Sequence, residues 1–144
     1  MPAVLSGPHG RFVHGKGTDR QVWIAGGVGV TPFLSWLRSL DEQPPPDRVD
    51  FFYSVSQESD GEVPYLAEMR AILERHPEVD LHVVRSAVDG RLTARRVLER
   101  SGADPRHLSI FMCGPEPMVR DLQQGFRADG VSALRIHREH FDWR

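Results

Sequence analysis

The stretch Gly26-Gly27-Val28-Gly29-Val30-Thr31-Pro32 decides the fold of this 144-residue chain, because it leads from an apolar run into a helix through three glycines. The preceding run, residues 22–25, predicts a short buried strand. Thr31 is a favourable N-cap, and Pro32 suits the first helical position. One helical face then carries the apolar residues Phe33, Leu34, Trp36, Leu37 and Leu40. The stretch therefore predicts a strand–turn–helix unit of an α/β protein.

The same alternation of strand-like and helix-like segments continues along the chain. Further strands are expected at residues 49–55, 79–84, 108–112 and 133–137. Helices are expected over residues 64–75, after Thr93, and from Met118 until Gly130. This order predicts a doubly wound, five-stranded parallel sheet with strand order 3-2-1-4-5, a Rossmann-like α/β fold.

The composition of the chain limits the kinds of function that it can have. Hydrophobic residues make up 40% and charged residues 26%, which is typical of one globular domain. A net charge of −2 offers no basic surface for nucleic acid. Cys113 is the only cysteine, which excludes a disulfide framework and favours a cytoplasmic setting. His137 and His140 would point to opposite faces of a strand, so no metal site is expected.

Two glycine-bearing turns carry the chemistry. In the first, Gly26, Gly27 and Gly29 let the backbone approach a ligand, and the helix that follows favours a pyrophosphate at its start. A close-packed turn without a ligand is the alternative for this loop alone. The second turn, residues 113–118, also leads from a strand into a helix. Strands 1 and 4 are neighbours in the expected order, so both turns meet at the crevice where such sheets bind dinucleotides.

Four motifs, GPHGRF, GGVGVTP, CGPEPM and REHF, together resemble the ferredoxin–NADP reductase superfamily. Within it they are most similar to bacterial ferric-reductase-like membrane proteins and NADPH oxidases. The resemblance covers nearly the whole chain. It implies that residues 1–16 are the end of a flavin-binding barrel and that residues 17–144 are an NAD(P)H-binding domain. The Arg-x-Tyr-Ser/Thr motif that binds flavin in such barrels is absent, so this chain alone is not expected to hold FAD.

The resemblance also assigns roles to residues of the two loops. It implies that the pyrophosphate and the nicotinamide ribose are held by the first loop, at Gly26, Gly27, Val28, Gly29, Thr31 and Pro32. In the second loop, the nicotinamide ring is expected against Cys113 and Gly114 with Pro115 beside them, and the adenine side near Pro117 and Met118. Cys113 would act as a small, polarizable side chain and not as a nucleophile, since no partner base is evident. The alternative is a buried structural thiol.

Glu139 and Phe141 match the family's acidic-x-aromatic ending. The resemblance implies that the carboxylate lies beside the point of hydride transfer and that the aromatic ring covers the flavin until nicotinamide displaces it. Cys113, Glu139 and Phe141 are thus the expected catalytic residues. An incidental aromatic residue in a C-terminal strand is the alternative. Without flavin, the segment after His137 is expected to be mobile or held only by chance contacts.

The choice between NADPH and NADH depends on residues that follow the second and third strands. Ser54 and Ser56 offer hydroxyl groups, and Arg85 and Arg91 could bind a 2′-phosphate. Close relatives often carry arginine where Ser56 stands. NADPH is favoured, and NADH remains open.

The expected function is to position the nicotinamide of NAD(P)H for hydride transfer to FAD in a flavin domain of the same parent chain. Electrons would pass on to haem, ferric iron or oxygen, and a transmembrane haem domain is a further candidate partner. The chain alone is expected to be inactive. The alternatives are a non-catalytic dinucleotide-sensing module and the reductase component of a soluble oxygenase or flavodoxin system.

Overall fold

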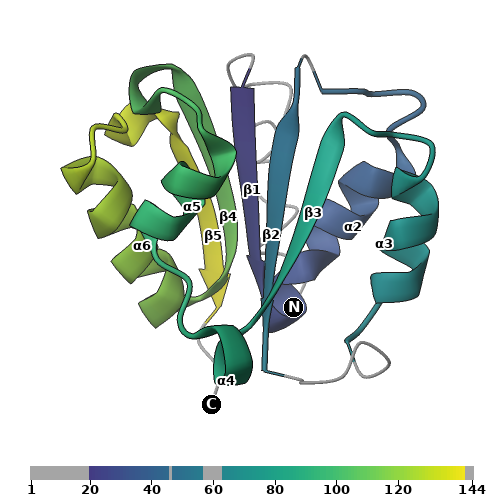
Figure 1. Ribbon diagram of the computed structural model, residues 1–144, viewed down its shortest axis with the longest axis horizontal. Helices are drawn as coiled ribbons and strands as arrows, with labels where there is room; N and C mark the ends of the chain where they lie inside the picture. The colour runs from purple at the N-terminus through teal and green to yellow at the C-terminus, as the bar shows by residue number, and fades with distance from the viewer. Residues whose placement is uncertain (1–19, 46, 57–62, 142–144) are drawn as a thin grey trace.

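The computed structural model describes residues 20–45, 47–56 and 63–141, which form a five-stranded parallel sheet in the order β3-β2-β1-β4-β5 (Figure 1). The strands are β1 (Arg20–Gly26), β2 (Val49–Val55), β3 (Val79–Arg85), β4 (Leu108–Pro115) and β5 (Ile136–Phe141). All four strand pairs are parallel, which confirms the predicted sheet and its strand order. The expected barrel remnant, residues 1–16, lies outside the described residues.

Helices cover both faces of the sheet (Figure 1). Helices α2 (Thr31–Arg38) and α3 (Leu66–Leu73) lie on one face, and α5 (Ala94–Ser101) and α6 (Glu116–Ala128) lie on the other. A single-turn helix, α4 (Ser86–Asp89), follows β3. Short 3-10 helices are η2 (Gly27–Val30), η4 (Pro105–His107) and η5 (Ala133–Arg135).

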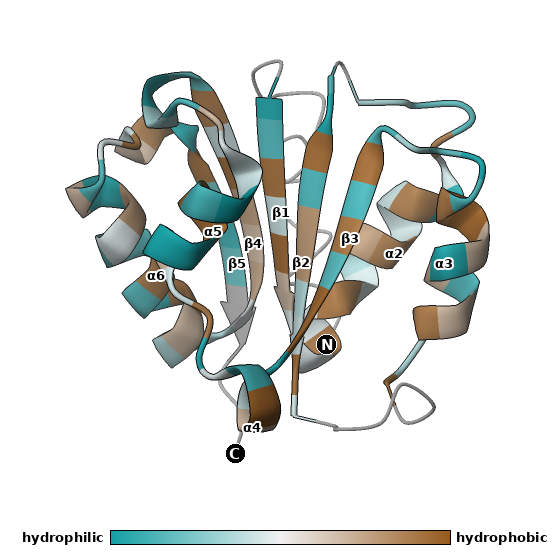
Figure 2. Cartoon of the chain, in the orientation of Figure 1, coloured by the Kyte–Doolittle hydropathy of each residue, from teal (hydrophilic) through white to brown (hydrophobic). Residues whose placement is uncertain are grey.

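Each face of the sheet has its own hydrophobic core. On the α2–α3 face, Trp23 of β1 packs edge-on against Trp36, with 4.9 Å between ring centroids, and Trp36 contacts Phe111 of β4. On the other face the core is mostly aliphatic, and α5 contributes Ala94, Val97 and the partly buried Leu98 to it. The rest of α5 is largely hydrophilic (Figure 2). Because helices bury both faces, the central strands are almost continuously apolar in sequence.

The bounds of β4 and β5 differ most from the prediction. β4 extends to Pro115, so Cys113 and Gly114 are strand residues and not part of a loop. The fifth strand starts at Ile136, because Ser132 caps the 3-10 turn η5 by accepting a hydrogen bond from the Leu134 N–H. It then continues to Phe141, which pairs with Pro115. The expectation of a mobile segment after His137 is therefore wrong up to Phe141, since β4 provides backbone partners for it.

Helix starts also differ: α6 begins at Glu116 and not at Met118. The helix expected over residues 64–75 is shorter, because Tyr65 has a left-handed backbone (φ 64°) and α3 begins only after it. Thr31 is not an N-cap: it is the first residue of α2, and its hydroxyl donates a hydrogen bond back to the Val28 carbonyl, at 3.1 Å. The sequence did not predict η2, with which the helical backbone starts four residues before α2.

Within the described ranges, no helix has the length and apolar character needed to cross a membrane.

Candidate functional site

The two glycine-bearing segments interlock at the carboxyl edge of the sheet, as predicted. An ideal Cβ atom placed on Gly29 of η2 would lie 2.1 Å from the carbonyl oxygen of Cys113. One on Gly26 would lie 2.5 Å from the sulfur of Met118, and one on Gly114 would lie 3.3 Å from the backbone nitrogen of Gly26. Gly29 must therefore be glycine whether or not a ligand is bound, because the atom it would meet belongs to the backbone. A Cβ on Gly26 would displace the flexible end of the Met118 side chain, and one on Gly114 would fit only tightly.

Gly27 differs from those three glycines. Its φ is +56°, and no atom lies within 4 Å of an ideal Cβ at this position. Its neighbour Val28 is 55% exposed, and Thr31 is also exposed. Gly27 thus opens η2 at the surface, where the first N–H groups of a helix have no intrahelical partner. This is the part of the loop that can receive an anion such as a pyrophosphate.

Cys113 and Glu139 are brought together by the pairing of β4 with β5. They are direct register partners, and the Cys113 side chain is fully buried in the core on the α2–α3 face. Burial raises the pKa of the Cys113 thiol to about 12, and the nearby Glu139 carboxylate adds to the effect. The thiol is therefore neutral, which agrees with the prediction that it is not a nucleophile. Of Phe141 only the backbone position, opposite Pro115, is described.

The remaining residues of the second segment lie around the start of α6. Pro117 is exposed, while Pro115 and Met118 are half-buried. Met118 packs its sulfur against Gly26, beneath the crossing of the two segments. The expected contacts of Pro117 and Met118 with adenine stay predictions.

The residues proposed to distinguish NADPH from NADH do not all lie together. Ser54 is at the end of β2, exposed Ser56 follows it, and Arg85 ends β3 beside Val55. Asp89 accepts a hydrogen bond from the Arg85 backbone N–H, at 2.9 Å. Arg91, in contrast, lies in the segment between α4 and α5 and forms an ion pair with Asp121 of α6. Ser54, Ser56 and Arg85 share the carboxyl edge, whereas the guanidinium of Arg91 has a partner elsewhere.

A pocket that the sequence did not predict lies beside η2. Its volume is about 280 Å³, and it is lined by Gly27, Val28, Val30, Thr31, Tyr53, Val55, Pro64 and Tyr65. Its walls come from the first loop, from β2 and from the turn before α3. Sequence reasoning missed Tyr65, because the residue sits in what looks like an ordinary helix start. No local signal in the sequence marks its left-handed backbone.

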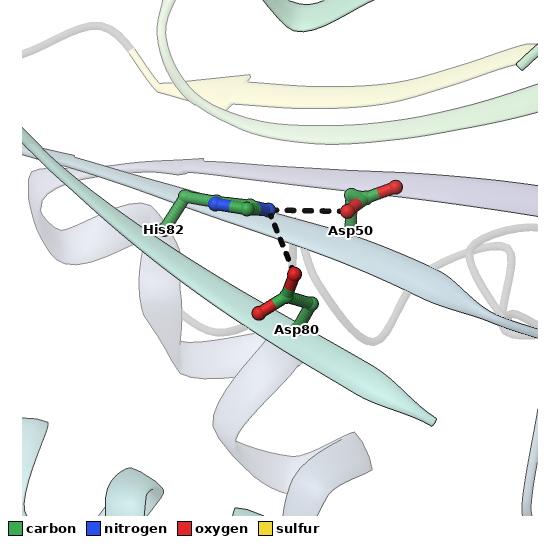
Figure 3. Close-up of side chains that lie close together, drawn as sticks. All are labelled: Asp50, Asp80 and His82. Atoms are coloured by element: carbon green, nitrogen blue, oxygen red, sulfur yellow. Dashed lines mark hydrogen bonds and ion pairs between the residues drawn. The ribbon is translucent and has the colours of Figure 1, made fainter. Parts of the chain in front are cut away.

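A polar cluster occupies the opposite, amino edge of the sheet (Figure 3). The Nε2 atom of His82 lies 3.1 Å from Asp50 and 3.6 Å from Asp80, and these three side chains could share a metal ion. The second oxygen of Asp50 pairs with Arg20 at 2.9 Å, and Arg20 also donates to the Ser101 carbonyl at 2.7 Å. The cluster therefore ties β1, β2, β3 and α5 together, far from the two glycine-bearing segments.

Comparison with known proteins agrees with this geometry. A sequence profile of the oxidoreductase NAD-binding domain matches residues 23–124. The glycine betaine monooxygenase reductase subunit of Chromohalobacter salexigens is 30% identical to this chain, over 96% of the chain and 40% of that subunit.

Solved structures share the fold. A cytochrome P450 reductase from Amycolatopsis has a TM-score of 0.67 and 27% identity, covering 85% of this chain and 37% of that one. A flavohemoglobin from Malassezia yamatoensis, solved with bound FAD and haem, has a TM-score of 0.66 and 26% identity, covering 87% of this chain and 32% of that one. The chain thus spans well under half the length of these relatives. Because the profile covers well over half of the chain, the chain belongs to the oxidoreductase NAD-binding domain family, within the ferredoxin–NADP reductase superfamily.

Proposed function

We propose that this chain binds NAD(P)H at the carboxyl edge of its sheet and presents the nicotinamide ring to FAD held by a separate flavin domain. The observation that carries the proposal is the open start of η2 at Gly27, next to the packed crossing of Gly29 with Cys113. An anion-binding helix start and the Cys113–Glu139 pair thereby share one edge of the sheet. This is where doubly wound sheets bind dinucleotides.

The residues present fit such a ligand. The exposed backbone at Gly27 and Val28 would bind the pyrophosphate, with Thr31 beside it. Gly114 would lie under the nicotinamide ring, the buried, neutral Cys113 would support that strand from the core, and Glu139 would lie next to the reactive edge of the ring. When bound, FAD supplies the electron-accepting ring to which the nicotinamide gives its hydride. The protein contributes position and electrostatics rather than covalent chemistry.

Calorimetric titration of this chain with NADPH, NADH and FAD tests the proposal. We expect measurable binding of at least one dinucleotide, no stoichiometric retention of FAD, and negligible dye reduction when FAD is added. Absence of binding for both dinucleotides would refute the function. Tight FAD retention or rapid turnover by the chain alone would refute the idea that the flavin is held by a separate domain.

A more specific proposal concerns the electron acceptor. Similarity to the monooxygenase reductase subunit favours transfer through FAD to an oxygenase component. The motif resemblance to ferric reductases favours haem, ferric iron or oxygen, with a transmembrane haem domain as partner. In a full-length protein, Phe141→Ser distinguishes either reductase from a non-catalytic sensing module. In a reductase we expect tighter dinucleotide binding and slower turnover, whereas a sensing module would have no turnover to change.

A further inference from the structure

Tyr65 has a backbone conformation that bulky residues rarely adopt. With φ 64° and ψ 6°, it is the one non-glycine residue in the described ranges with a positive φ. A Cβ atom crowds the neighbouring carbonyl oxygen in this conformation, so glycine is the usual occupant. Strained residues of this kind persist where the surrounding structure holds them, and they concentrate at ligand sites.

The turn that holds Tyr65 is fixed from both sides. The buried hydroxyl of Tyr53 donates a hydrogen bond to the Pro64 carbonyl, at 3.3 Å. The Tyr65 carbonyl accepts a hydrogen bond from the Met69 N–H, at 2.9 Å, in the first turn of α3. The direction of the Tyr65 side chain is thus set by its backbone, and the ring remains 50% exposed.

The Tyr65 ring lines the 280 Å³ pocket beside η2, together with Gly27, Val28 and Thr31 of the first loop. Ligand pockets commonly measure roughly 300–1,000 Å³, so this one has room for a single ring or sugar and not for a whole dinucleotide. Its walls are aromatic and aliphatic side chains with a few hydroxyl groups. Such walls suit a neutral, flat or sugar-like group.

We propose that Tyr65 is a binding residue of the dinucleotide site, and that its ring closes a compartment for the sugar or ring adjoining the pyrophosphate. The inference rests on the function proposed above, because Gly27 is shared between the pyrophosphate position and this compartment. A tyrosine side chain offers a large, rigid contact at a low cost in conformational entropy. The strained backbone is retained because only this conformation presents the ring to the first loop.

The variant Tyr65→Gly tests the proposal, because glycine adopts φ 64° without strain while the ring is lost. We expect this variant to unfold at the temperature of the wild type or slightly above it. Calorimetric titration should nevertheless show NADPH and NADH binding weakened about three- to tenfold, the effect of losing one aromatic stacking contact. Leu134→Ala is the matched control, since Leu134 is an 88% exposed apolar residue of η5 outside the pocket. Its affinity should equal that of the wild type.

Titrations with AMP and with nicotinamide mononucleotide identify the half of the ligand that contacts Tyr65. Weakening of either fragment by Tyr65→Gly supports the proposal. A folded Tyr65→Gly variant that binds both dinucleotides as the wild type does would overturn it. If Gly27→Ala abolishes binding in the same experiment, the proposed function still stands and only the role of Tyr65 fails. If the wild type binds neither dinucleotide, both fail.

Discussion

Replacing Gly27 with alanine separates ligand binding from folding at the first loop. The backbone at Gly27 is left-handed, with φ +56°, where a Cβ costs about 1–2 kcal/mol. No protein atom lies within 4 Å of the new methyl group, so a steric clash adds nothing to that cost. For a domain of this size, the loss corresponds to a decrease in melting temperature of roughly 3–8 °C. The domain should therefore remain folded.

The Gly27→Ala substitution should reduce dinucleotide affinity more than it reduces the stability of the fold. The methyl group of the Gly27→Ala variant would project into the space beside the start of η2, where the pyrophosphate is proposed to lie. A hydrogen bond to a charged group contributes about 1.5–3 kcal/mol, so losing one weakens binding roughly 10- to 150-fold. Calorimetry with NADPH and NADH measures this loss, and circular dichroism confirms the fold.

Two other glycines provide controls. Gly102 ends α5 with φ +67° and likewise has no atom within 4 Å of an ideal Cβ, so Gly102→Ala carries the same backbone strain away from the site. It should lose similar stability and no affinity. Gly29→Ala should fail to fold properly, because its Cβ would collide with the Cys113 carbonyl. Equal dinucleotide affinity in the Gly27→Ala and Gly102→Ala variants would refute the placement of the pyrophosphate.

Three further predictions concern other side chains. If Arg85 binds the 2′-phosphate, Arg85→Ala should weaken NADPH binding at least about tenfold more than NADH binding. The guanidinium of Arg91 pairs with Asp121, so Arg91→Ala should affect the binding of both dinucleotides equally. Equal losses of NADPH and NADH affinity in Arg85→Ala would assign Arg85 a structural role. Burial raises the pKa of the Asp50 carboxyl, but hydrogen bonds from His82 and Arg20 outweigh it and hold the pKa below its ordinary value. Because the pKa of Asp50 is lower in the folded state, its ionised carboxylate stabilises the fold above about pH 4, and this stabilisation is lost as the pH falls through the folded-state pKa. The melting temperatures of the wild type and of Asp50→Asn should therefore converge in acid. A constant difference in melting temperature from pH 7 to pH 3 would contradict this. Cys113, with a pKa of about 12, should resist thiol reagents at pH 8 until the chain is unfolded, and rapid labelling of the folded chain would show that it is accessible.

The sequence by itself predicted the class of fold, the strand order and the two segments that form the candidate site. These features depend on local periodicity and on glycine turns, which can be recognised within a window of ten to twenty residues. The cross-strand pairing of Cys113 with Glu139 did not follow from the sequence, which placed Cys113 in a loop and ended the fifth strand at His137. The limits of β4 and β5 did not follow, because a strand continues as long as its neighbour provides backbone partners.

The tertiary structure alone decided what each glycine does. In sequence, Gly26, Gly27 and Gly29 look equivalent, yet only Gly27 faces open space. A Cβ on Gly29 would collide with the Cys113 backbone, and one on Gly26 would displace the Met118 side chain. Those contacts join segments more than eighty positions apart, and they depend on the register between β1 and β4. The left-handed backbone of Tyr65 likewise depends on contacts between segments that are distant in sequence. Its strain is maintained by Tyr53 on a neighbouring strand, and no pattern of residues around position 65 encodes that distant support.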